Sequence, residues 1–455
     1  MRSLKTPATT LERTRAISKN FFLHIHAAKL DPYVLKPTFT FGLGVVATSL
    51  FLILITSGIF LLFYYTPSIE RAYFSILDIT YVVSGGRFLR NLHRWSAHGL
   101  VFISLLHLAR VFYTGAYSRG RGLVWYSGMI LLLLVLSFSF SGYLLPWDQL
   151  AFWAVTIASN IANATREIGV PAFMDPGRFL KYLLLGGDQV GQATLTRFFL
   201  LHVVFLPITT LFMLGYHFWR MRKSDGLNTP GSMSAATGSE TSGDPVSDNM
   251  PNTKWLSWPV LIWAELSVFI VTLALVLLFA YLIDAPLRAM ANPTIPENPA
   301  KSPWYFLGVQ ELVSYSAFSG GIAIPLLLLA GLFLIPVFDR EDKQPGTWFS
   351  GTEGLRITIL SVLFALPVAI GAILLSPVTA PAFRGQPLLT MLLNPGTLLT
   401  ILYIIWALLL GRKYRSRRYS ALALFTVSSV GFVVLTVVGI WFRGTDWQFI
   451  WPWGL

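Results

Sequence analysis

The sequence predicts an all-α polytopic membrane protein, in which a four-helix bundle is followed by about five further transmembrane helices. Of its 455 residues, 54% are hydrophobic and only 12% are charged, whereas soluble proteins carry about 25% charged residues. Apolar runs long enough to cross a bilayer also recur along the chain, and the mean hydropathy is +0.62. The net charge of +13 therefore indicates basic loops that face anionic lipid, and we expect no nucleic-acid partner.

Nine apolar runs are the candidate spans, and most exceed the roughly 20 residues that a transmembrane helix needs. The connection 147–195 is long and mixed in charge, so we expect it at the membrane surface. Pro395 and Gly396 interrupt the eighth run. In chain order, the runs are 41–65, 89–113, 123–146, 196–220, 258–283, 317–338, 356–376, 388–411 and 419–442.

The charged loops predict the orientation of these spans. With the N-terminus inside, the inner loops include the basic N-terminal segment and the cluster of five basic residues between the last two runs. The outer loop between 376 and 388 then offers only Arg384. No signal-peptide pattern opens the chain. We therefore expect a multi-pass protein of a bacterial cytoplasmic membrane with its N-terminus in the cytoplasm.

A low-complexity run at 223–254, rich in Ser, Thr, Gly, Asn and Asp, predicts a flexible linker. It separates a four-span part, which contains the paired histidines described next, from a five-span part without them. We expect these units: a cytoplasmic segment 1–40, a four-helix domain 41–222, the linker 223–254, a second region 255–345, and additional helices with an aromatic tail at 346–455.

Four histidines lie as two pairs inside two of the apolar runs. His93 and His107 are fourteen positions apart, and His202 and His217 are fifteen positions apart. At about 1.5 Å and 100° per residue, the members of each pair are separated by roughly 21–22 Å and look broadly in one direction. One member then lies near each face of a bilayer core about 30 Å thick. Two such helices would hold two planar ligands, each between one histidine of either helix.

Imidazole is a good axial ligand for iron, and polar side chains in hydrocarbon usually have a function. The alternative is that each histidine forms an interhelical hydrogen bond, which explains two pairs at near-equal spacing less well. His98 has no partner at the required spacing and is interpreted as structural. His24 and His26 are assigned no role.

Glycines give a second, independent signal. Gly44 and Gly58 in the first run, and Gly128 and Gly142 in the third, repeat the interval of the first histidine pair. A flat macrocycle needs a helix face without side chains. Helix packing through small residues would instead favour a spacing of about one helical turn. The interval shared with the histidines therefore favours heme clefts at two depths.

Arginines near the proposed ligands give a third signal. Heme propionates are anionic, and a guanidinium group pairs with a carboxylate through two hydrogen bonds. The alternative is the positive-inside rule with snorkelling side chains, which explains Arg90 and Arg197 less well because they lie at outer ends. The candidates are Arg90, Arg94, Arg110 and Arg197, and Arg222 follows His217.

Several motifs make a family resemblance specific. The stretches "FLRNLHRWSAHGL", "LLHLARVFYTGAY", "SGYLLPWDQLAFWAV" and "GQATLTRFFLLHVVFLPITTLFMLGYHFWRMRK" resemble the four-helix heme core of cytochrome b. The longer spacing of the second histidine pair, "FYYTP" and "PWDQ" resemble its cytochrome b6 branch. The resemblance is dense over about 36–223. It continues more loosely from 255 to about 340 as the companion subunit IV region and becomes weak beyond about 345.

This resemblance implies a diheme cytochrome b subunit of a bc-type complex, a quinol:cytochrome c (or plastocyanin-type) oxidoreductase. His93 and His202 would hold the outer heme b, and His107 and His217 the inner one. Membrane quinol would be oxidised at an outer site. One electron would pass to a Rieske iron–sulfur protein and a c-type cytochrome, and the other through both hemes to an inner quinone site, coupled to proton translocation. The family usually works as a dimer with other complex subunits.

The resemblance places the outer quinol pocket between the end of the third run and the loop after the fifth. Tyr143, Pro146, Trp147 and Phe152 lie at the first of these positions.

The second position should carry the family's Pro-Glu-Trp-Tyr motif. Trp304 and Tyr305 match it, but Ser302 and Pro303 replace the Pro-Glu pair. The acidic residue that the family uses as a proton acceptor is therefore missing. Glu311 is a candidate substitute, with a structural ion pair or a solvated loop end as its alternative. Glu297 and Asp148 are further candidates.

Two more departures concern the ends of the resemblance. The b6 branch carries a covalent c-type heme on a cysteine at the start of the first span, where this chain has Gly42, and the chain has no cysteine. We therefore expect no covalent heme. The tail "WFRGTDWQFIWPWGL" surrounds Arg443 with aromatic residues, which suggests an outer-face anchor or a docking site for a partner subunit.

Two other functions stay open. A heme b membrane anchor of a dehydrogenase or hydrogenase would exchange electrons with quinone without bifurcation, and the altered Pro-Glu-Trp-Tyr motif is compatible with it. A transporter without a redox role agrees less well with the sequence. The sequence lacks the broken-helix repeats of transporters, and transport would not explain the histidine spacing.

Overall fold

The computed structural model describes residue 26 and residues 29–171, 174–224, 227, 229, 255–341, 343–382 and 387–453. Within these ranges, nine helices are long and apolar enough to cross a membrane, so the predicted fold class is confirmed. The predicted linker 223–254 lies almost entirely outside the described residues, as does most of the predicted segment 1–40.

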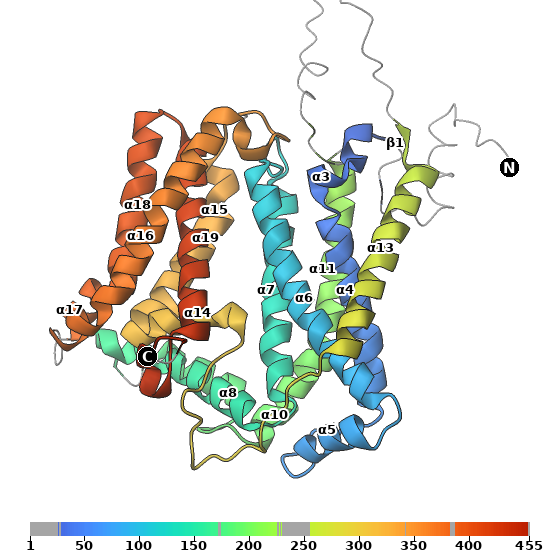
Figure 1. Cartoon of the computed structure of the whole chain (residues 1–455), viewed down its shortest axis with the longest axis vertical. Helices are drawn as coiled ribbons and strands as arrows, with labels where there is room; N and C mark the ends of the chain where they lie inside the picture. The colour runs from blue at the N-terminus through green and yellow to red at the C-terminus, as the bar shows by residue number, and fades with distance from the viewer. Residues whose placement is uncertain are drawn as a thin grey trace, which may run out of the picture.

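The first four spans form one bundle (Figure 1). Its members are α4 (Leu43–Leu62), α6 (Gly86–Tyr113), α7 (Gly122–Leu144), and a long helix made of α10 (Gln192–Leu200), η4 (Leu201–Phe205) and α11 (Leu206–Lys223). The fifth span, α13 (Ser257–Leu282), packs against α4 and α6 on the flank of this bundle. A two-residue pairing of β1 (Lys29–Leu30) with β2 (Trp255–Leu256) joins the approaches to α4 and α13.

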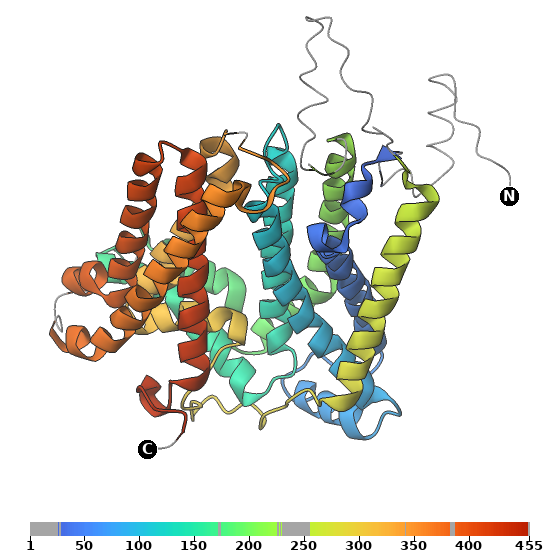
Figure 2. The ribbon, with the colours of Figure 1, turned by 45° about the horizontal axis from the view of Figure 1, so that its top comes forward.

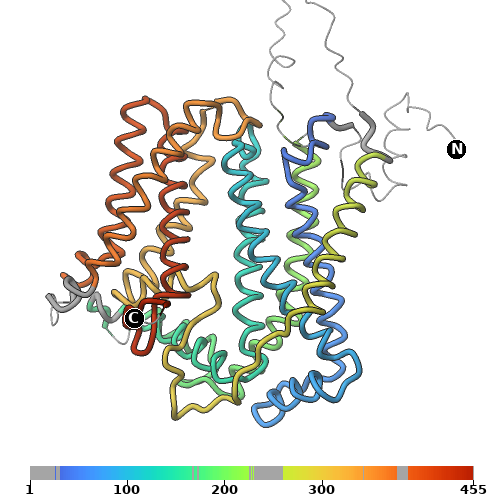
Figure 3. Tube along the Cα trace, in the orientation of Figure 1, coloured from blue at the N-terminus to red at the C-terminus, as the bar shows by residue number. Residues whose placement is uncertain are grey.

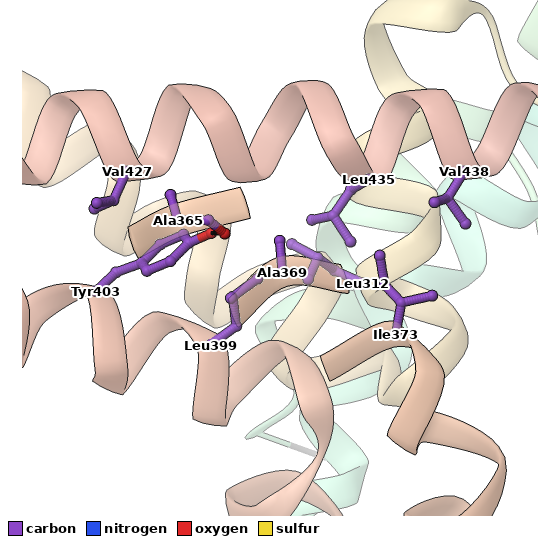
Figure 4. Packing of buried hydrophobic residues seen from close by; sticks show 9 residues of the cluster. All are labelled: Leu312, Ala365, Ala369, Ile373, Leu399, Tyr403, Val427, Leu435 and Val438. Carbon is purple, nitrogen blue, oxygen red and sulfur yellow. Dashed lines mark hydrogen bonds between the residues drawn. The ribbon is translucent and has the colours of Figure 1, made fainter. Parts of the chain in front are cut away.

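The remaining four spans stand on the other side of α7 (Figure 2). They are η5–α15 (Ser319–Ala323 and Ile324–Phe338), α16 (Thr352–Ala382), α18 (Pro395–Lys413) and α19 (Arg417–Trp441). The shorter helix α14 (Trp304–Tyr315) lies against α19. Figure 4 shows the shared core, where Leu312 of α14 meets Ile373 of α16 and Leu435 and Val438 of α19.

Short helices collect at one end of the molecule, which we call the α8 end (Figure 1). The segment 283–303 runs along this end from α13 to α14 (Figure 3). It pairs with the α7–α8 corner, where Gln149 N donates to Ala289 O at 2.8 Å and Ala291 N donates to Trp147 O at 3.1 Å. Over both ends of the molecule, the short helices among the described residues are η1 (Pro32–Leu35), α3 (Pro37–Thr40), α5 (Ala72–Tyr81), α8 (Gln149–Ile161), η2 (Ala162–Ile168), α9 (Pro176–Leu185), η6 (Trp348–Ser350), α17 (Pro387–Leu393) and η7 (Thr445–Trp447).

Two spans contain a π-helical turn, and a proline explains each. Pro207 and Pro325 are the second residues of α11 and α15, directly after η4 and η5. Proline lacks the N–H that would bond to the carbonyl four residues earlier, and its ring clashes with that carbonyl. A wider turn relieves this clash without ending the helix.

The structure corrects the eighth predicted span. The run 388–411 is not one helix, because α17 ends at Leu393 and a new helix, α18, begins at Pro395. Asn394 is the N-cap, and its side chain accepts a hydrogen bond from Thr397 N at 3.0 Å. Proline is favoured in the first turn and the capping amide satisfies a free N–H, so the break is a helix start and the span extends to Lys413.

Candidate functional site

The two histidine-bearing helices face each other at matching depths. The ring centres of His93 on α6 and His202 on η4 lie 6.3 Å apart, with an angle of 71° between the ring planes. A metal–imidazole bond of about 2 Å, plus about 1.1 Å from the nitrogen to the ring centre, places two axial rings about 6.3 Å apart. The observed separation therefore leaves room for one metal ion between these two rings.

The second pair, His107 and His217, forms another layer of the same bundle. His107 and His217 are close enough to interact electrostatically. The layer is defined further by two glycines, since a Cβ at Gly44 would lie 3.5 Å from His107 Cε1 and a Cβ at Gly128 would lie 3.5 Å from His217 Cε1. Each layer thus brings together one histidine of α6 and one histidine of the α10–η4–α11 helix.

The glycines beside the His93–His202 pair lie even closer to the imidazoles. A Cβ at Gly58 would lie 3.2 Å from His93 Cε1, and a Cβ at Gly142 would lie 2.4 Å from His202 Cε1. Real Cβ atoms essentially never approach a neighbour to less than 3.0 Å. Gly142 therefore makes room for the His202 ring and Gly58 leaves a tight fit for His93, whereas a methyl group at Gly44 or Gly128 would make ordinary van der Waals contact.

Three serines hold the imidazoles in orientation. Nδ1 of His93, His202 and His217 is hydrogen-bonded to a serine Oγ, which belongs in turn to Ser57 at 2.9 Å, Ser141 at 3.2 Å and Ser127 at 2.7 Å. Each serine precedes one of the four glycines in the sequence. At the fourth position, before Gly44, the chain has Leu43.

The serine hydroxyls also favour one histidine tautomer. Each Oγ donates its only proton to a backbone carbonyl of its own helix, at 2.7 Å for Ser57, 2.9 Å for Ser127 and 2.8 Å for Ser141. With the hydroxyl proton on that carbonyl, the imidazole Nδ1 can donate to Oγ. This leaves Nε2 of these three histidines as the lone-pair nitrogen that can bind a metal. The sequence reasoning did not use these serines, although the repeated Ser-Gly dipeptide was visible.

The predicted arginines divide into two groups. Among the described residues, Arg94 Nε and Arg110 Nη2 are buried without a hydrogen-bond partner. Arg90 donates to Pro286 O at 2.8 Å. Arg197 donates to Tyr182 O at 3.1 Å and to Leu183 O near the end of α9. Arg94 and Arg110 thus retain buried donors for an anionic group, although Arg110 also donates to Phe39 O at 3.2 Å. Arg90 fastens the segment after α13, and Arg197 fastens the end of α9.

The residues expected around an outer pocket do gather at one corner. Tyr143 lies within electrostatic range of Arg94, Asp148, Tyr305 and Glu297. Pro146 lies in the turn between α7 and α8, beside Leu145, whose carbonyl accepts a hydrogen bond from Tyr65 at 2.6 Å.

Trp304 and Tyr305 open α14 and point into the first bundle. Trp304 Nε1 donates to His98 Nδ1 at 3.1 Å, and the His98 and Tyr305 ring centres are 5.9 Å apart. The Tyr305 hydroxyl lies near Ser139 of α7. His98, interpreted from the sequence as structural, thus contacts a distant part of the chain that no sequence spacing indicated.

Glu311 is committed to an ion pair and does not face this corner as a free carboxylate. It is fully buried, and Arg443 Nε donates to its Oε2 at 3.0 Å while Arg443 Nη2 donates to its Oε1. Tyr315 and Trp447 donate to the same carboxylate at 2.7 and 2.8 Å. Of the three roles considered for Glu311, the structure supports the structural ion pair and argues against both the solvated loop end and the proton acceptor.

The two other carboxylates differ in how fully they are bonded. Asp148 is the N-cap of α8, accepting from Ala151 N at 2.9 Å, and its second oxygen accepts from Arg288 N at 3.1 Å. Glu297 Oε1 lies 3.8 Å from Arg288 Nε. Glu297 Oε2 is buried and has no hydrogen-bond partner among the described residues. Glu297 is therefore the carboxylate at this corner that can still accept a proton without breaking a hydrogen bond.

Gly42, where a covalent heme would be attached in the b6 branch, begins α4 in the left-handed conformation with φ of 60°. A Cβ at this position would lie 3.3 Å from both Val268 methyl groups of α13. The close approach of α13 and the positive φ together account for glycine here.

Comparison with known proteins agrees with the arrangement of the first bundle. A family model described as cytochrome b/b6/petB matches residues 29–225. Cytochrome b6 of Euglena gracilis and that of Mastigocladus laminosus are each 41% identical over 189 residues, which is 41% of this chain and 83% of theirs. Cytochrome b6 of Gracilaria tenuistipitata var. liui is 41% identical over 187 residues, or 82% of its length.

One structural relative extends over nearly the whole chain. A chain of a solved hyperthermophilic respiratory Complex III aligns with a TM-score of 0.61 and 23% identity, covering 95% of this chain and 97% of that chain. This likeness shows a shared fold, including the helices that the cytochrome b6 relatives do not cover. The sequence relatives and the histidine bundle together show that this chain belongs to the cytochrome b/b6 family, whose members bind heme b and form part of bc- and b6f-type quinol oxidoreductase complexes in membranes.

Proposed function

We propose that the chain is the diheme cytochrome b subunit of a bc-type complex that oxidises membrane quinol at the α8 end. In this proposal one electron goes to a Rieske iron–sulfur protein and a c-type cytochrome, and the other crosses to a quinone site at the opposite end, coupled to proton translocation. The observation that carries the proposal is the 6.3 Å separation of the His93 and His202 rings. A second pair, His107 and His217, lies farther along the same two helices.

The ligand assignment follows from the free nitrogens. His93 and His202 would bind one heme through Nε2, and His107 and His217 would bind the other. Heme b bound there supplies reversible one-electron transfer. Arg94 and Arg110 are the best propionate partners because each keeps a buried, unpartnered donor within the described structure. Arg90 and Arg197 each use one guanidinium nitrogen to bind a backbone carbonyl and could bind an anion through their other N–H groups.

Quinol binding is proposed at the corner of Tyr143, Pro146, Trp304 and Tyr305. The aromatic rings supply an apolar slot, and the tyrosine hydroxyls supply hydrogen-bond donors and acceptors. Glu297 is proposed as the proton acceptor that replaces the missing acidic residue of the Pro-Glu-Trp-Tyr motif. It combines an unpartnered oxygen, as far as the structure is described, with electrostatic proximity to Tyr143.

The cellular setting is also a proposal. Basic residues at the end opposite to α8 favour that end as the cytoplasmic one. We therefore place the chain in a bacterial cytoplasmic membrane, with its N-terminus inside and in a complex that is dimeric. We expect no covalent heme, because Gly42 has no thiol.

A second candidate is a heme b anchor for a dehydrogenase or hydrogenase. Pro303 precedes Trp304 in place of an acidic residue, and Glu311 is committed to Arg443. An anchor that merely exchanges electrons with quinone does not need a dedicated proton acceptor at that position.

The test is heme quantification with subunit identification on the purified native complex. Two bis-imidazole b hemes per chain are expected, and His202→Ala should remove one of them while His98→Ala keeps both. A single heme in the wild-type chain would contradict the diheme assignment. Co-purification of a Rieske protein, together with block of heme reduction by an outer-site quinol inhibitor, distinguishes the bc-type subunit from the anchor.

A further inference from the structure

The chain ends in a hairpin that folds back under α19. Residues 442–453, which we call the C-terminal hairpin, are closed by Gly444 N donating to Gln448 O at 3.0 Å and Ile450 N donating to Phe442 O at 3.0 Å. Asp446 and Trp447 at its tip have φ values of 54° and 58°. Such conformations are costly for residues other than glycine and persist where surrounding contacts fix them. Specific contacts therefore hold the hairpin in this conformation.

The contacts that fix the hairpin lead to α14. Glu311 of α14 accepts four hydrogen bonds, two from Arg443, one from Tyr315 and one from Trp447. Arg443 also donates to Trp447 O at 3.2 Å. The Glu311 and Arg443 side chains are 0% and 6% exposed, so the pair is excluded from solvent and its geometry is set by these bonds.

The segment leading into α14 is fastened to the same region. Lys301 Nζ donates to Ile440 O at 2.8 Å. Asn298 Nδ2 donates to Asp446 Oδ1, and Asp446 N donates to Asn298 Oδ1, both at 2.7 Å. Both the body of α14 and its approach are thus tied to the end of the chain.

Small residues bring α19 itself close to α14. A Cβ at Gly308 would lie 3.0 Å from Phe432 Cδ2 and from Thr436 Oγ1. A Cβ at Gly439 would lie 3.2 Å from Leu307 Cβ. Leu312 completes the contact by packing among Leu435 and Val438 (Figure 4).

We propose that α19 and the C-terminal hairpin form a clamp that positions α14, and that Arg443 is the positioning residue, acting through Glu311. Trp304 and Tyr305 lie at the N-terminal end of α14, roughly 10 Å along the axis from Glu311. Because a helix this short moves as a rod, fixing its middle fixes the two aromatic side chains against α6 and α7. The inference rests on the proposed quinol site and assigns it a positioning element from the far end of the chain.

The clamp is tested with the double variant Glu311→Gln/Arg443→Gln in the complete complex. Neutralising both partners avoids leaving one buried charge unpaired, which would destabilise the fold. We expect unchanged heme content but faster hydrogen exchange of the α14 amides. With whichever short-chain quinol, ubiquinol or menaquinol, the wild type oxidises faster, kcat/KM should fall roughly 10- to 100-fold, mainly through a higher KM.

Two matched variants separate positioning from general stability. Lys343→Gln removes an ion pair with Glu341 at 3.3 Å, away from α14. Trp453→Ala alters a hairpin residue that is 79% exposed. Both should keep wild-type exchange in α14 and wild-type KM, and an equal rise of KM in either would overturn the clamp.

The remaining outcomes are also decisive. If the α14 amides of the double variant exchange hydrogen at the wild-type rate, the clamp is overturned and the proposed function is not affected. Faster exchange with unchanged kinetics overturns the link between the clamp and the quinol site. A wild-type complex with both hemes that oxidises neither quinol overturns the proposed function, and with it the purpose of the clamp.

Discussion

Arg418 and Asp339 form an ion pair in which the two side chains are only 2% and 3% exposed. Arg418 Nη1 lies 3.3 Å from Asp339 Oδ2, and the Tyr117 hydroxyl donates to the same oxygen. Arg418 also donates to Ser350 Oγ and Phe112 O, both at 2.9 Å. The start of α19 is thereby joined to the end of the first bundle opposite to α8. Burial raises the pKa of the Asp339 carboxyl above its usual range, and Arg418 and Tyr117 oppose this shift.

Loss of one member of this pair should be costly. Arg418→Met leaves Asp339 buried without its cation and should lower the free energy of unfolding by about 3–5 kcal/mol. Arg418→Met combined with Asp339→Leu should cost clearly less, because neither charge remains. Unfolding titrations in detergent measure both variants. Equal losses for the single and double variants would contradict this account.

Gly142 should not tolerate a methyl group. A Cβ there would lie 2.4 Å from His202 Cε1, so Gly142→Ala should displace the imidazole and reduce the heme content at the His93–His202 layer. Gly331→Ala is the control, since its Cβ would meet nothing within 4 Å in the described structure. Pyridine hemochrome quantification reads out both. Full heme occupancy in Gly142→Ala would refute the role given to this glycine.

Glu297 should matter for quinol oxidation in a pH-dependent way. Glu297→Gln removes the proposed proton acceptor and should lower kcat roughly 10²- to 10⁴-fold, the usual range for loss of a general base. The heme spectrum should be unchanged. Glu297→Asp should restore part of the rate with a shifted pH profile. A wild-type profile in Glu297→Gln would remove Glu297 from the mechanism.

Asp284 should stabilise the contact between α13 and α6 except in strong acid. The hydrogen bonds from Arg87 and Asn91 lower the pKa of Asp284 to about 2. Because the folded-state pKa lies below the unfolded value, the stabilisation is present above about pH 4 and is lost as the pH falls toward 2. Asp284→Asn should therefore lower the Tm slightly at pH 7, by an amount that shrinks in acid. A constant difference across pH would point to a steric cause.

The sequence predicted well the features that depend on local periodicity. The nine spans and the two histidine layers follow from apolar length and from the near-equal intervals within the two histidine pairs, because helix geometry fixes depth and direction. The interval between Gly128 and Gly142 equals that between His93 and His107, so it predicted the same two depths. The helix start at Asn394 was missed because hydropathy does not detect a helix cap, and the π-helical turns before Pro207 and Pro325 were missed as well.

Contacts between distant segments were not predictable in this way. Glu311 and Arg443 are 132 residues apart, and neither spacing nor composition selects one basic residue over another as a partner. Trp304 and His98 present the same difficulty. The serines at positions 57, 127 and 141 are a different case, because the dipeptide was visible but its meaning depends on a histidine from another helix.

Leu43 stands where a fourth serine would complete the pattern. The layer of His93 and His202 has two imidazoles with a hydroxyl acceptor on Nδ1, whereas the layer of His107 and His217 has a serine on one of them. An imidazole whose Nδ1–H is held by an acceptor is the more basic ligand. In the proposed diheme bundle, the His93–His202 pair would therefore be the more basic pair of ligands, and a serine hydroxyl would set the difference between the two layers.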